Sequence, residues 1–187
     1  MKKTIIASLF VLLGFTACDF LNEVPQDRLS PESYFKTETD LQLFTNPLYD
    51  NLLDKDAYEH QSDHCIHLNL SSELHGGTFR TVPATGGGWS WGNLRRINTL
   101  LGNSFNCENE SVRAHYDAVA RFFRAMFYFE KVKRFGDVPW IDVELGSESE
   151  QLFAPRDSRE LVMQNMIKDI DYASANLPEQ ISTLRVT

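Results

Sequence analysis

Two tryptophans beside a glycine-rich loop bring flat aromatic faces together with hydrogen-bond donors. Trp89 and Trp91 follow three consecutive glycines at 86–88, with Arg80 before them and Asn93 after them. An indole presents a flat apolar face to the C–H surface of a sugar ring, while guanidinium and amide groups donate hydrogen bonds to hydroxyls. Glycines also let a ligand come close to the backbone. These four side chains are the predicted ligand-binding set, with the alternative that Trp91 belongs to the core of the helix that follows it.

Cys18 lies in a segment typical of lipid attachment. Residues 1–3 are positively charged, residues 5–15 carry no charge, and two small residues precede the cysteine. This pattern is typical of an export signal and is too short to span a membrane as a helix. It resembles the bacterial lipobox, although Phe15 stands where leucine is usual. We predict cleavage before Cys18 and lipidation of its thiol with acyl chains such as palmitate; an ordinary signal peptide is the alternative.

Lipid on this cysteine predicts a protein that is anchored to a membrane and does not cross it. Each buried CH₂ group contributes about 0.8 kcal/mol, so two or three acyl chains hold firmly where one does not. The expected organisation is a lipoprotein signal peptide over 1–17, a tether over 18–29 and a helical domain over 30–187.

The acidic composition excludes two classes of partner. The chain has 187 residues and a formal charge of −8; without the two lysines of the export signal, 16 basic and 26 acidic residues remain, a charge of −10. Such a surface repels nucleic acid and anionic headgroups. The length is sufficient for one domain with a hydrophobic core.

Hydrophobic periodicity predicts helices joined by long loops. Helix starts are expected at Ser30 and at Thr37, and the second helix is expected to kink or split at Pro47. A stripe from Trp91 to Leu101 predicts a further helix that Gly102 ends. Residues 54–88 have weak periodicity and are expected to form loops.

The strongest predicted helix runs from about Ser111 to Phe135, with Gly136 as its C-cap. It is apolar nearly all round, except for a narrow polar stripe: Arg121, Arg124, Tyr128 and Lys131. A helix with this pattern is packed on several sides. We expect the two arginines to be structural, bonding loop carbonyls or carboxylates.

The last predicted helix begins with a capping-box-like pair, Asp157 and Glu160, and ends at Pro178. Its predicted apolar stripe comprises Met163, Met166, Ile167, Ile170, Ala173 and Leu177. The expected fold is mainly α, with helical pairs and long loops that resemble a tetratricopeptide-type stack, although no 34-residue signature repeats.

Neither a metal centre nor an enzyme is predicted. His60, His64 and His67 would share one face of a helix, but the flanking residues give little support for a helix and no C-x-x-C pair occurs. Three carboxylates lie between 137 and 144, but their nearness in sequence does not give the spacing of a glycosidase pair. The sequence also lacks the G-x-S-x-G, H-E-x-x-H and phosphate-loop motifs. We therefore expect no catalytic residues, no metal and no cofactor.

Two further cysteines allow two outcomes. Cys65 and Cys107 belong to an exported chain, and disulfides persist outside the cytoplasm. Their spacing does not establish that they meet in space. A disulfide and two unpaired, buried thiols are the alternatives.

Two adjacent motifs resemble the signature of the SusD/RagB family of outer-membrane lipoproteins. Residues 121–129 read Arg-Phe-Phe-Arg-Ala-Met-Phe-Tyr-Phe, and residues 135–140 read Phe-Gly-Asp-Val-Pro-Trp. Weaker resemblances follow the family's order along the chain, at 31–35, 91–98, 156–178 and 185–187. Because members of the family are much longer, the resemblance implies a SusD-like N-terminal portion.

The resemblance implies a function as well as a fold. It implies a non-catalytic, lipid-anchored protein exposed at the cell outer membrane, which binds oligosaccharide or starch-like glycan as a lid on a SusC-like TonB-dependent transporter in nutrient uptake. Ligand aromatics of the family fall partly in the region of Trp89 and Trp91. The alternative is a transporter-associated assembly or peptide-binding lipoprotein whose ligand residues lie mainly in a C-terminal part. The resemblance names no particular glycan.

Overall fold

The computed structural model describes residues 33–51 and 86–179, and the part from Phe35 onward forms one compact unit. Its helices are α2 (Glu38–Thr45), α3 (Gly92–Asn103), α4 (Glu110–Phe135) and α5 (Arg159–Asn176), with short 3₁₀ turns η2 (Asn46–Asn51), η4 (Ser104–Asn106) and η5 (Glu150–Phe153). One isolated β-bridge joins Val138 and Asp157. The mainly α fold class predicted from the sequence is confirmed. No helix in these ranges is long and apolar enough to cross a membrane.

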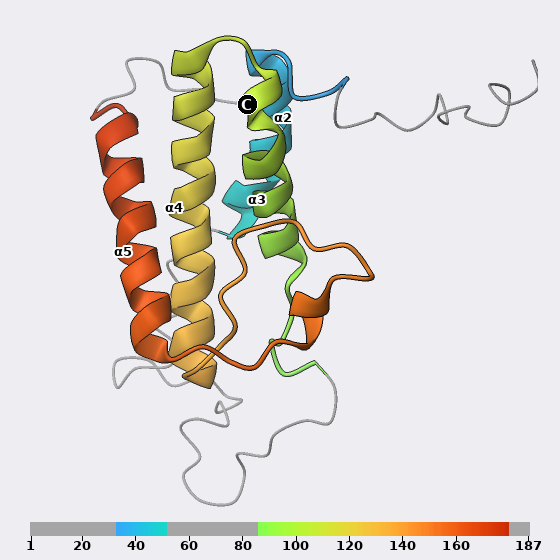
Figure 1. Cartoon of the computed structure of the whole chain (residues 1–187). Helices are drawn as coiled ribbons and strands as arrows, with labels where there is room; N and C mark the ends of the chain where they lie inside the picture. Colours follow the sequence, from blue (N-terminus) through green and yellow to red (C-terminus); the bar gives the residue numbers. More distant parts are fainter. Residues whose placement is uncertain (1–32, 52–85, 180–187) are drawn as a thin grey trace, which may run out of the picture. The chain divides into compact units, whose positions relative to one another are not determined.

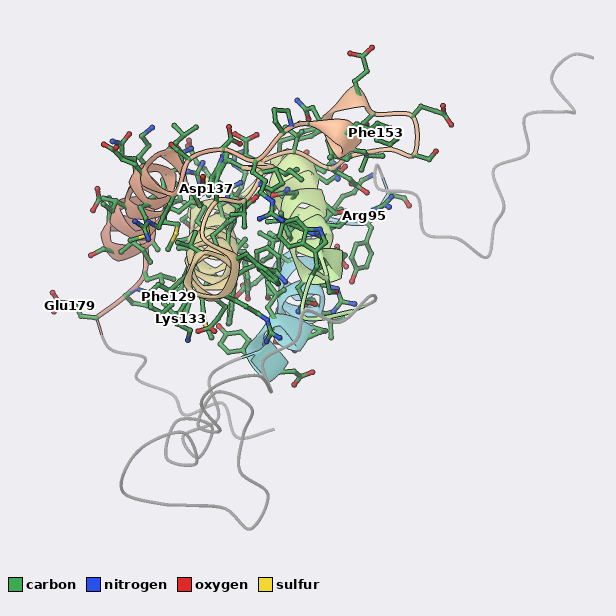
Figure 2. The ribbon with its side chains drawn as sticks, turned by 90° about the horizontal axis from the view of Figure 1, so that it is seen from below. Arg95, Phe129, Lys133, Asp137, Phe153 and Glu179 are labelled. Atoms are coloured by element: carbon green, nitrogen blue, oxygen red, sulfur yellow. The ribbon has the colours of Figure 1, made fainter. Side chains whose placement is uncertain are left out.

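Helix α4 occupies the centre of the unit. It packs against α3 on one side and α5 on the other, and α2 also lies against it. Consecutive helices run in opposite directions, as Figure 1 shows, and the view along the axes in Figure 2 separates α3 and α5 on the two flanks of α4. The prediction that this helix is packed on several sides is therefore confirmed.

Local capping explains where α2 begins and ends. Thr37 Oγ1 accepts from the Asp40 N–H at 3.2 Å, and Asp40 Oδ2 accepts from the Thr37 N–H at 2.9 Å. Hydrogen bonds to the Asp40 carboxylate from the side chain and then the backbone N–H of Thr37 hold the pKa of this carboxyl below its usual value. Pro47 lies in η2, where the α-helix has given way to a 3₁₀ turn, so the predicted split is confirmed. The other predicted start, at Ser30, lies outside the described residues.

Helix α4 begins one residue before the predicted start at Ser111 and ends at Phe135, as predicted. Asn109 Oδ1 accepts from the backbone N–H groups of Ser111 and Val112. Gly136 has a φ of +73° and donates its N–H to the Val132 carbonyl at 2.9 Å. A side chain rarely adopts this backbone conformation, which explains the glycine at this position.

Gly136→Ala is expected to lower the free energy of unfolding by about 1 kcal/mol, since alanine is strained at this φ. A Cβ at Gly136 would meet no other atom, so the cost comes from the backbone alone. Gly102→Ala is the matched control. Gly102 lies inside α3, also has open space around a Cβ, and should stabilise the protein by about 0.5–1 kcal/mol as alanine. Urea titrations that give both changes the same sign would contradict this explanation.

Gly102 also corrects a predicted boundary. It was expected to end the helix, but α3 continues to Asn103 and passes directly into η4. Gly102 is not among the described glycines with positive φ, so it keeps a helix-compatible conformation. The buried Leu100 and Ser104 on either side hold this part of the chain against the rest of the unit.

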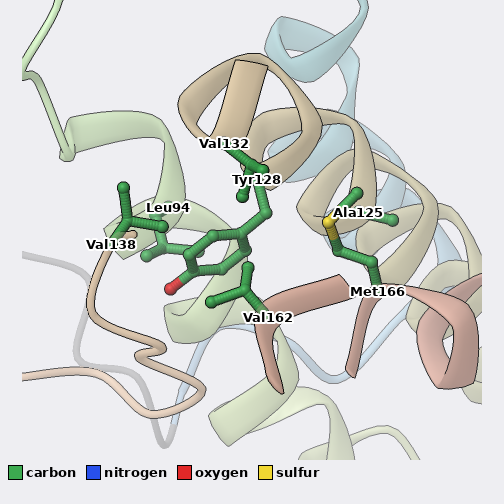
Figure 3. Close-up of a cluster of buried hydrophobic side chains, with 7 residues drawn as sticks. All are labelled: Leu94, Ala125, Tyr128, Val132, Val138, Val162 and Met166. Atoms are coloured by element: carbon green, nitrogen blue, oxygen red, sulfur yellow. The ribbon is translucent and has the colours of Figure 1, made fainter. Parts of the chain in front are cut away.

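The hydrophobic core lies where α3, α4 and α5 meet the segment after α4. Figure 3 shows this cluster gathered around the ring of Tyr128, which is fully buried. Its members are Leu94, Ala125, Tyr128, Val132, Val138, Val162 and Met166. The core therefore draws on the segment after α4 as well as on the helices.

The buried face of α5 differs from the predicted stripe. Met166 and Ala173 are buried as predicted, but Met163, Ile167 and Ile170 are 38%, 57% and 43% exposed. The buried positions are Val162, Met166, Asp169 and Ala173. Asp169 faces inward, where it pairs with Arg121 and Arg124. With this carboxylate on the buried face, the larger hydrophobic side chains of the predicted stripe lie toward solvent.

The N-cap of α5 also differs from the prediction. Ser158, and not Asp157, caps the helix, with its Oγ accepting from the Leu161 N–H at 3.3 Å. The Asp157 side chain instead accepts from the Trp140 N–H at 2.8 Å. Asp157 therefore ties the start of α5 to the segment that follows α4.

Candidate functional site

Three left-handed glycines shape the turn that leads into α3. Gly86, Gly87 and Gly88 have φ values of +79°, +61° and +83°. The Trp89 N–H donates to the Gly86 carbonyl at 3.0 Å and closes the turn. A run of three such conformations explains the triple glycine. The turn delivers the two tryptophans to the N-terminus of α3.

Trp89 lies in an aromatic cluster and is not an isolated exposed ring. Its ring centroid is 5.1 Å from that of Trp91 and 4.8 Å from that of Phe135, both edge to face. The Arg156 guanidinium lies over the indole at 4.8 Å from its centroid. The residue keeps 39% of its surface exposed. One face of this indole is therefore taken by a cation.

Trp91 is the N-cap residue of α3 and packs against the core cluster. Lys131 of α4 contacts both the glycine turn and the aromatic rings. Its Nζ donates to the Gly88 carbonyl and lies 4.9 Å from the Phe127 ring centroid and 5.8 Å from that of Trp91. Burial lowers the pKa of Lys131, and the charge of Arg134 adds to this. Lys131 thus binds the glycine turn to α4.

The segment from Asp137 to Ser158 folds back over α3 and is held there by two buried side chains. Asn98 Nδ2 donates to the carbonyls of Ile141 and Val143, each at 3.0 Å. The Ile141 N–H donates to Tyr128 Oη at 2.7 Å. Burial raises the pKa of Tyr128, since a charged phenolate is costly there.

An ion pair with little solvent exposure anchors the same region to α5. Arg124 Nε and Nη2 donate to the two carboxylate oxygens of Asp169 at 2.6 and 2.8 Å. Arg124 Nη1 also reaches the Asp142 carbonyl at 3.4 Å, and Arg121 Nη1 is 3.3 Å from Asp169. The prediction that both arginines bond loop carbonyls or carboxylates is confirmed.

A cavity of about 520 Å³ opens between the N-terminus of α3 and the folded-back segment. The two tryptophans form part of its wall, and apolar side chains form most of the rest. Its lining residues are Trp89, Trp91, Gly92, Leu94, Arg95, Asn98, Pro139, Ile141, Val143, Leu145, Gln151, Leu152, Ala154, Pro155 and Arg156. Apolar walls with a few convergent polar groups are typical of a small-molecule site.

The charged groups of this cavity are both cationic. Arg95 and Arg156 line it, and none of the lining residues named above carries a carboxylate. Arg95 Nε lies 3.5 Å from Glu144 in a pair whose side chains are 64% and 38% exposed. Arg156 Nη1 donates to the Asp137 carbonyl at 3.4 Å. The lining side chains therefore carry two positive charges, one of them paired with Glu144 outside the lining.

A second cavity, of about 540 Å³, surrounds the ion pair between α4 and α5. Arg124 and Asp169 line it, but their charges already satisfy each other. We therefore take the cavity beside the tryptophans as the candidate site.

The structure brings together only part of the predicted ligand set. Trp89 and Trp91 line the candidate cavity, and Trp91 packs against the core as well. Asn93 lines a different, smaller cavity of about 270 Å³, which it shares with Glu130 and Lys131. Arg80 lies outside the described residues, as does Cys18.

Sequence reasoning missed the cationic part of the site. Arg156 follows the tryptophans by more than sixty positions along the chain, and only the folding back of the segment before α5 brings it onto Trp89. Arg95 lies one helical turn after Trp91, so the spacing alone could have predicted that both side chains lie on the same face of α3. The local sequence around Arg156 carried none.

The side chains weighed above as metal ligands or catalytic carboxylates either lie outside the described residues or have structural partners. No cluster of three or more metal-binding side chains occurs within 33–51 and 86–179, and the histidines at 60, 64 and 67 lie outside these ranges. Asp137 Oδ1 accepts from the Arg159 N–H at 2.9 Å. Cys107 is a buried free thiol, whereas Cys65 falls among the residues that are not described.

Comparison with known proteins relates this chain to SusD-like proteins. A SusD-like family model described as "starch-binding associating with outer membrane" matches residues 35–185. Two relatives from Formosa agariphila match most of the chain: SusD-like protein P2 is 27% identical over 96% of it, and SusD-like protein P25 is 22% identical over 94%. The chain spans 39% and 38% of the lengths of these relatives. No solved structure matches it significantly.

The described residues form a mainly helical frame with a cavity whose wall includes two tryptophans. Because the family model matches most of its length, the chain belongs to the SusD/RagB family, whose members associate with the outer membrane and are binding proteins rather than enzymes. The recognition from residues 121–129 and 135–140 is thereby confirmed.

Proposed function

We propose that this chain is a surface-exposed, lipid-anchored subunit that captures oligosaccharides and passes them to a SusC-like TonB-dependent transporter. The observation that carries the proposal is the cavity in which Trp89 and Trp91 meet apolar walls and guanidinium donors. Such a site suits the apolar faces and the hydroxyl groups of a sugar. The family's description as starch-binding and associated with the outer membrane supports both the ligand class and the place.

Trp89→Ala is expected to weaken oligosaccharide binding by about two- to tenfold, because contact with an aromatic ring contributes about 0.5–1.5 kcal/mol. Calorimetry with a panel of oligosaccharides, maltotetraose included, measures the change. Phe129→Ala is the matched control, since Phe129 is an exposed aromatic on α4 that does not line the cavity. Melting temperatures of both variants separate lost binding from lost folding, because Trp89 also contacts Phe135.

The outcome divides clearly. If Trp89→Ala binds as tightly as the unaltered protein, the cavity is not the glycan site. If no oligosaccharide binds the unaltered protein, the proposed function is wrong. A transporter-associated assembly or peptide-binding protein is then the better explanation, with its ligand residues in the part of the relatives' length that this chain does not span.

Cys18→Ala is expected to abolish lipid attachment and to release the protein from the outer-membrane fraction. The thiol of Cys18 is the proposed acceptor of diacylglycerol, and without its acyl chains the anchoring energy of about 0.8 kcal/mol per buried CH₂ is lost. Radiolabelled palmitate and membrane fractionation measure the two effects. Cys107→Ala, which removes a buried thiol, is the control and should keep the label. Retention of palmitate by Cys18→Ala would contradict the assignment.

A further inference from the structure

We propose that the cavity prefers an acidic oligosaccharide, one that carries carboxylate or sulfate groups, over a neutral one. This inference rests on the proposed glycan-binding function and names the class of glycan. Its starting point is the pair of guanidinium groups of Arg95 and Arg156, which line a cavity with no carboxylate among the lining residues described above.

The position of Arg156 changes what Trp89 can do. A guanidinium lies over the indole at 4.8 Å from the ring centroid, so a sugar ring cannot stack on that face at the same time. Trp91 and Phe135 approach the same indole edge to face. Trp89 therefore serves as a platform that orients the cation as much as a surface for a neutral sugar.

A guanidinium held in this way is prepared for an oxyanion. It has five N–H donors in one plane, and Arg156 uses one of them on the Asp137 carbonyl at 3.4 Å. No ion pair to Arg156 occurs among the residues that the structure describes. Stacking on an aromatic face with in-plane bonds to a carboxylate, sulfate or phosphate is a recurrent role of arginine.

Arg95 supplies the second positive charge. Its only recorded carboxylate partner in the described part is Glu144, at 3.5 Å and with both side chains substantially exposed. An exposed pair of this kind contributes little free energy, so a ligand anion can replace Glu144. The N-terminus of α3 adds to the positive potential of the two arginines, since Trp91 provides no side-chain cap and the first turn contains no acidic residue.

Calorimetry on matched glycan pairs tests the proposal. Oligogalacturonides are compared with their methyl esters, and sulfated oligosaccharides with their desulfated forms, so that the members of each pair share one sugar backbone and differ only at the acidic groups; maltotetraose is the neutral reference. In at least one pair the acidic form should bind about tenfold or more tightly, as one charge-assisted contact predicts. That preference should weaken as the ionic strength rises. The two pairs distinguish a carboxylate from a sulfate as the recognised group.

Variants of opposite sign sharpen the test. Arg156→Gln should reduce the acidic preference several-fold, with Arg95 supplying what is left, whereas Glu144→Gln should increase the preference, because Arg95 then faces the ligand without a competing carboxylate. Arg113→Gln removes the same charge far from the cavity and should leave the preference unchanged. Melting temperatures confirm that each variant is folded.

Two results would overturn the proposal and are distinguishable. Equal affinity for both members of every pair, or tighter binding of the neutral members, refutes the acidic preference while the glycan-binding function stands. Failure of every glycan to bind refutes the proposed function, and this inference with it. A preference that Arg156→Gln leaves at its full size refutes the role of that residue.

Discussion

Replacing Asp169 by asparagine is expected to lower the free energy of unfolding by roughly 3–5 kcal/mol, because the change leaves a buried charge without its partner. Asp169 is the carboxylate of a pair in which both side chains are almost fully buried, 2% exposed for Asp169 and 7% for Arg124. Asparagine keeps the shape but removes the charge, so the Arg124 guanidinium stays buried without a counter-ion. Arg121 loses the same partner. Urea unfolding followed by circular dichroism measures the change.

The exposed pair on α4 is the control for burial. Lys133 Nζ lies 2.8 Å from Glu130 Oε1, a distance similar to that of the buried pair, but both side chains are at least two-fifths exposed. Glu130→Gln should therefore change the free energy of unfolding by less than about 1 kcal/mol. Equal losses for Glu130→Gln and Asp169→Asn would show that burial does not set the strength of these pairs.

A double variant separates two explanations of the same loss. If the cost arises from an unpaired charge, Arg124→Met with Asp169→Leu should recover much of the stability, because apolar groups can replace a buried ion pair. If the cost arises from the hydrogen bonds of Arg124 to the Asp142 carbonyl and Asn98, the double variant should be no better than the single one. A double-mutant cycle gives the coupling energy directly.

The sequence predicted those features of the fold that depend on local chemistry. The Thr37 capping box, the split at Pro47 and the end of α4 at Gly136 each follow from one or a few adjacent residues. In contrast, the face that α5 buries depends on Asp169. This carboxylate pairs with Arg124, which lies 45 residues earlier in the sequence. A hydrophobic pattern cannot register a buried carboxylate. It placed Met166 and Ala173 correctly, but it also assigned the exposed Met163, Ile167 and Ile170 to the buried face.

The same distinction applies to the candidate site. The two tryptophans could be recognised because they adjoin a run of glycines, and the structure places both on one cavity. The opposite wall could not be recognised, because Asn98 binds the carbonyls of Ile141 and Val143 across more than forty residues. Backbone carbonyls carry no sequence signal, so the path of this segment could not be predicted. Arg156, which the segment places over Trp89, was missed for that reason.

Tyr128→Ala is expected to lower the free energy of unfolding by about 3–5 kcal/mol, because the ring is fully buried at the centre of the core cluster. Tyr128→Phe isolates the hydroxyl. Its removal leaves the Ile141 N–H without its 2.7 Å partner and should cost about 1–3 kcal/mol. Since Pro139 and Ile141 also line the cavity, the phenylalanine variant should weaken glycan binding as well.

Alkaline pH provides a second test of the same residue. Burial raises the pKa of Tyr128, so the folded protein keeps the hydroxyl protonated where the unfolded chain ionises. The stability that Tyr128 contributes is therefore complete below its ordinary pKa of about 10 and is lost as the pH rises above that value. Tyr128→Phe has no such group, so the difference in stability between the two proteins should narrow from neutral to alkaline pH. A difference that stays constant, measured by urea unfolding across that range, would show that the hydroxyl is not buried in the folded protein.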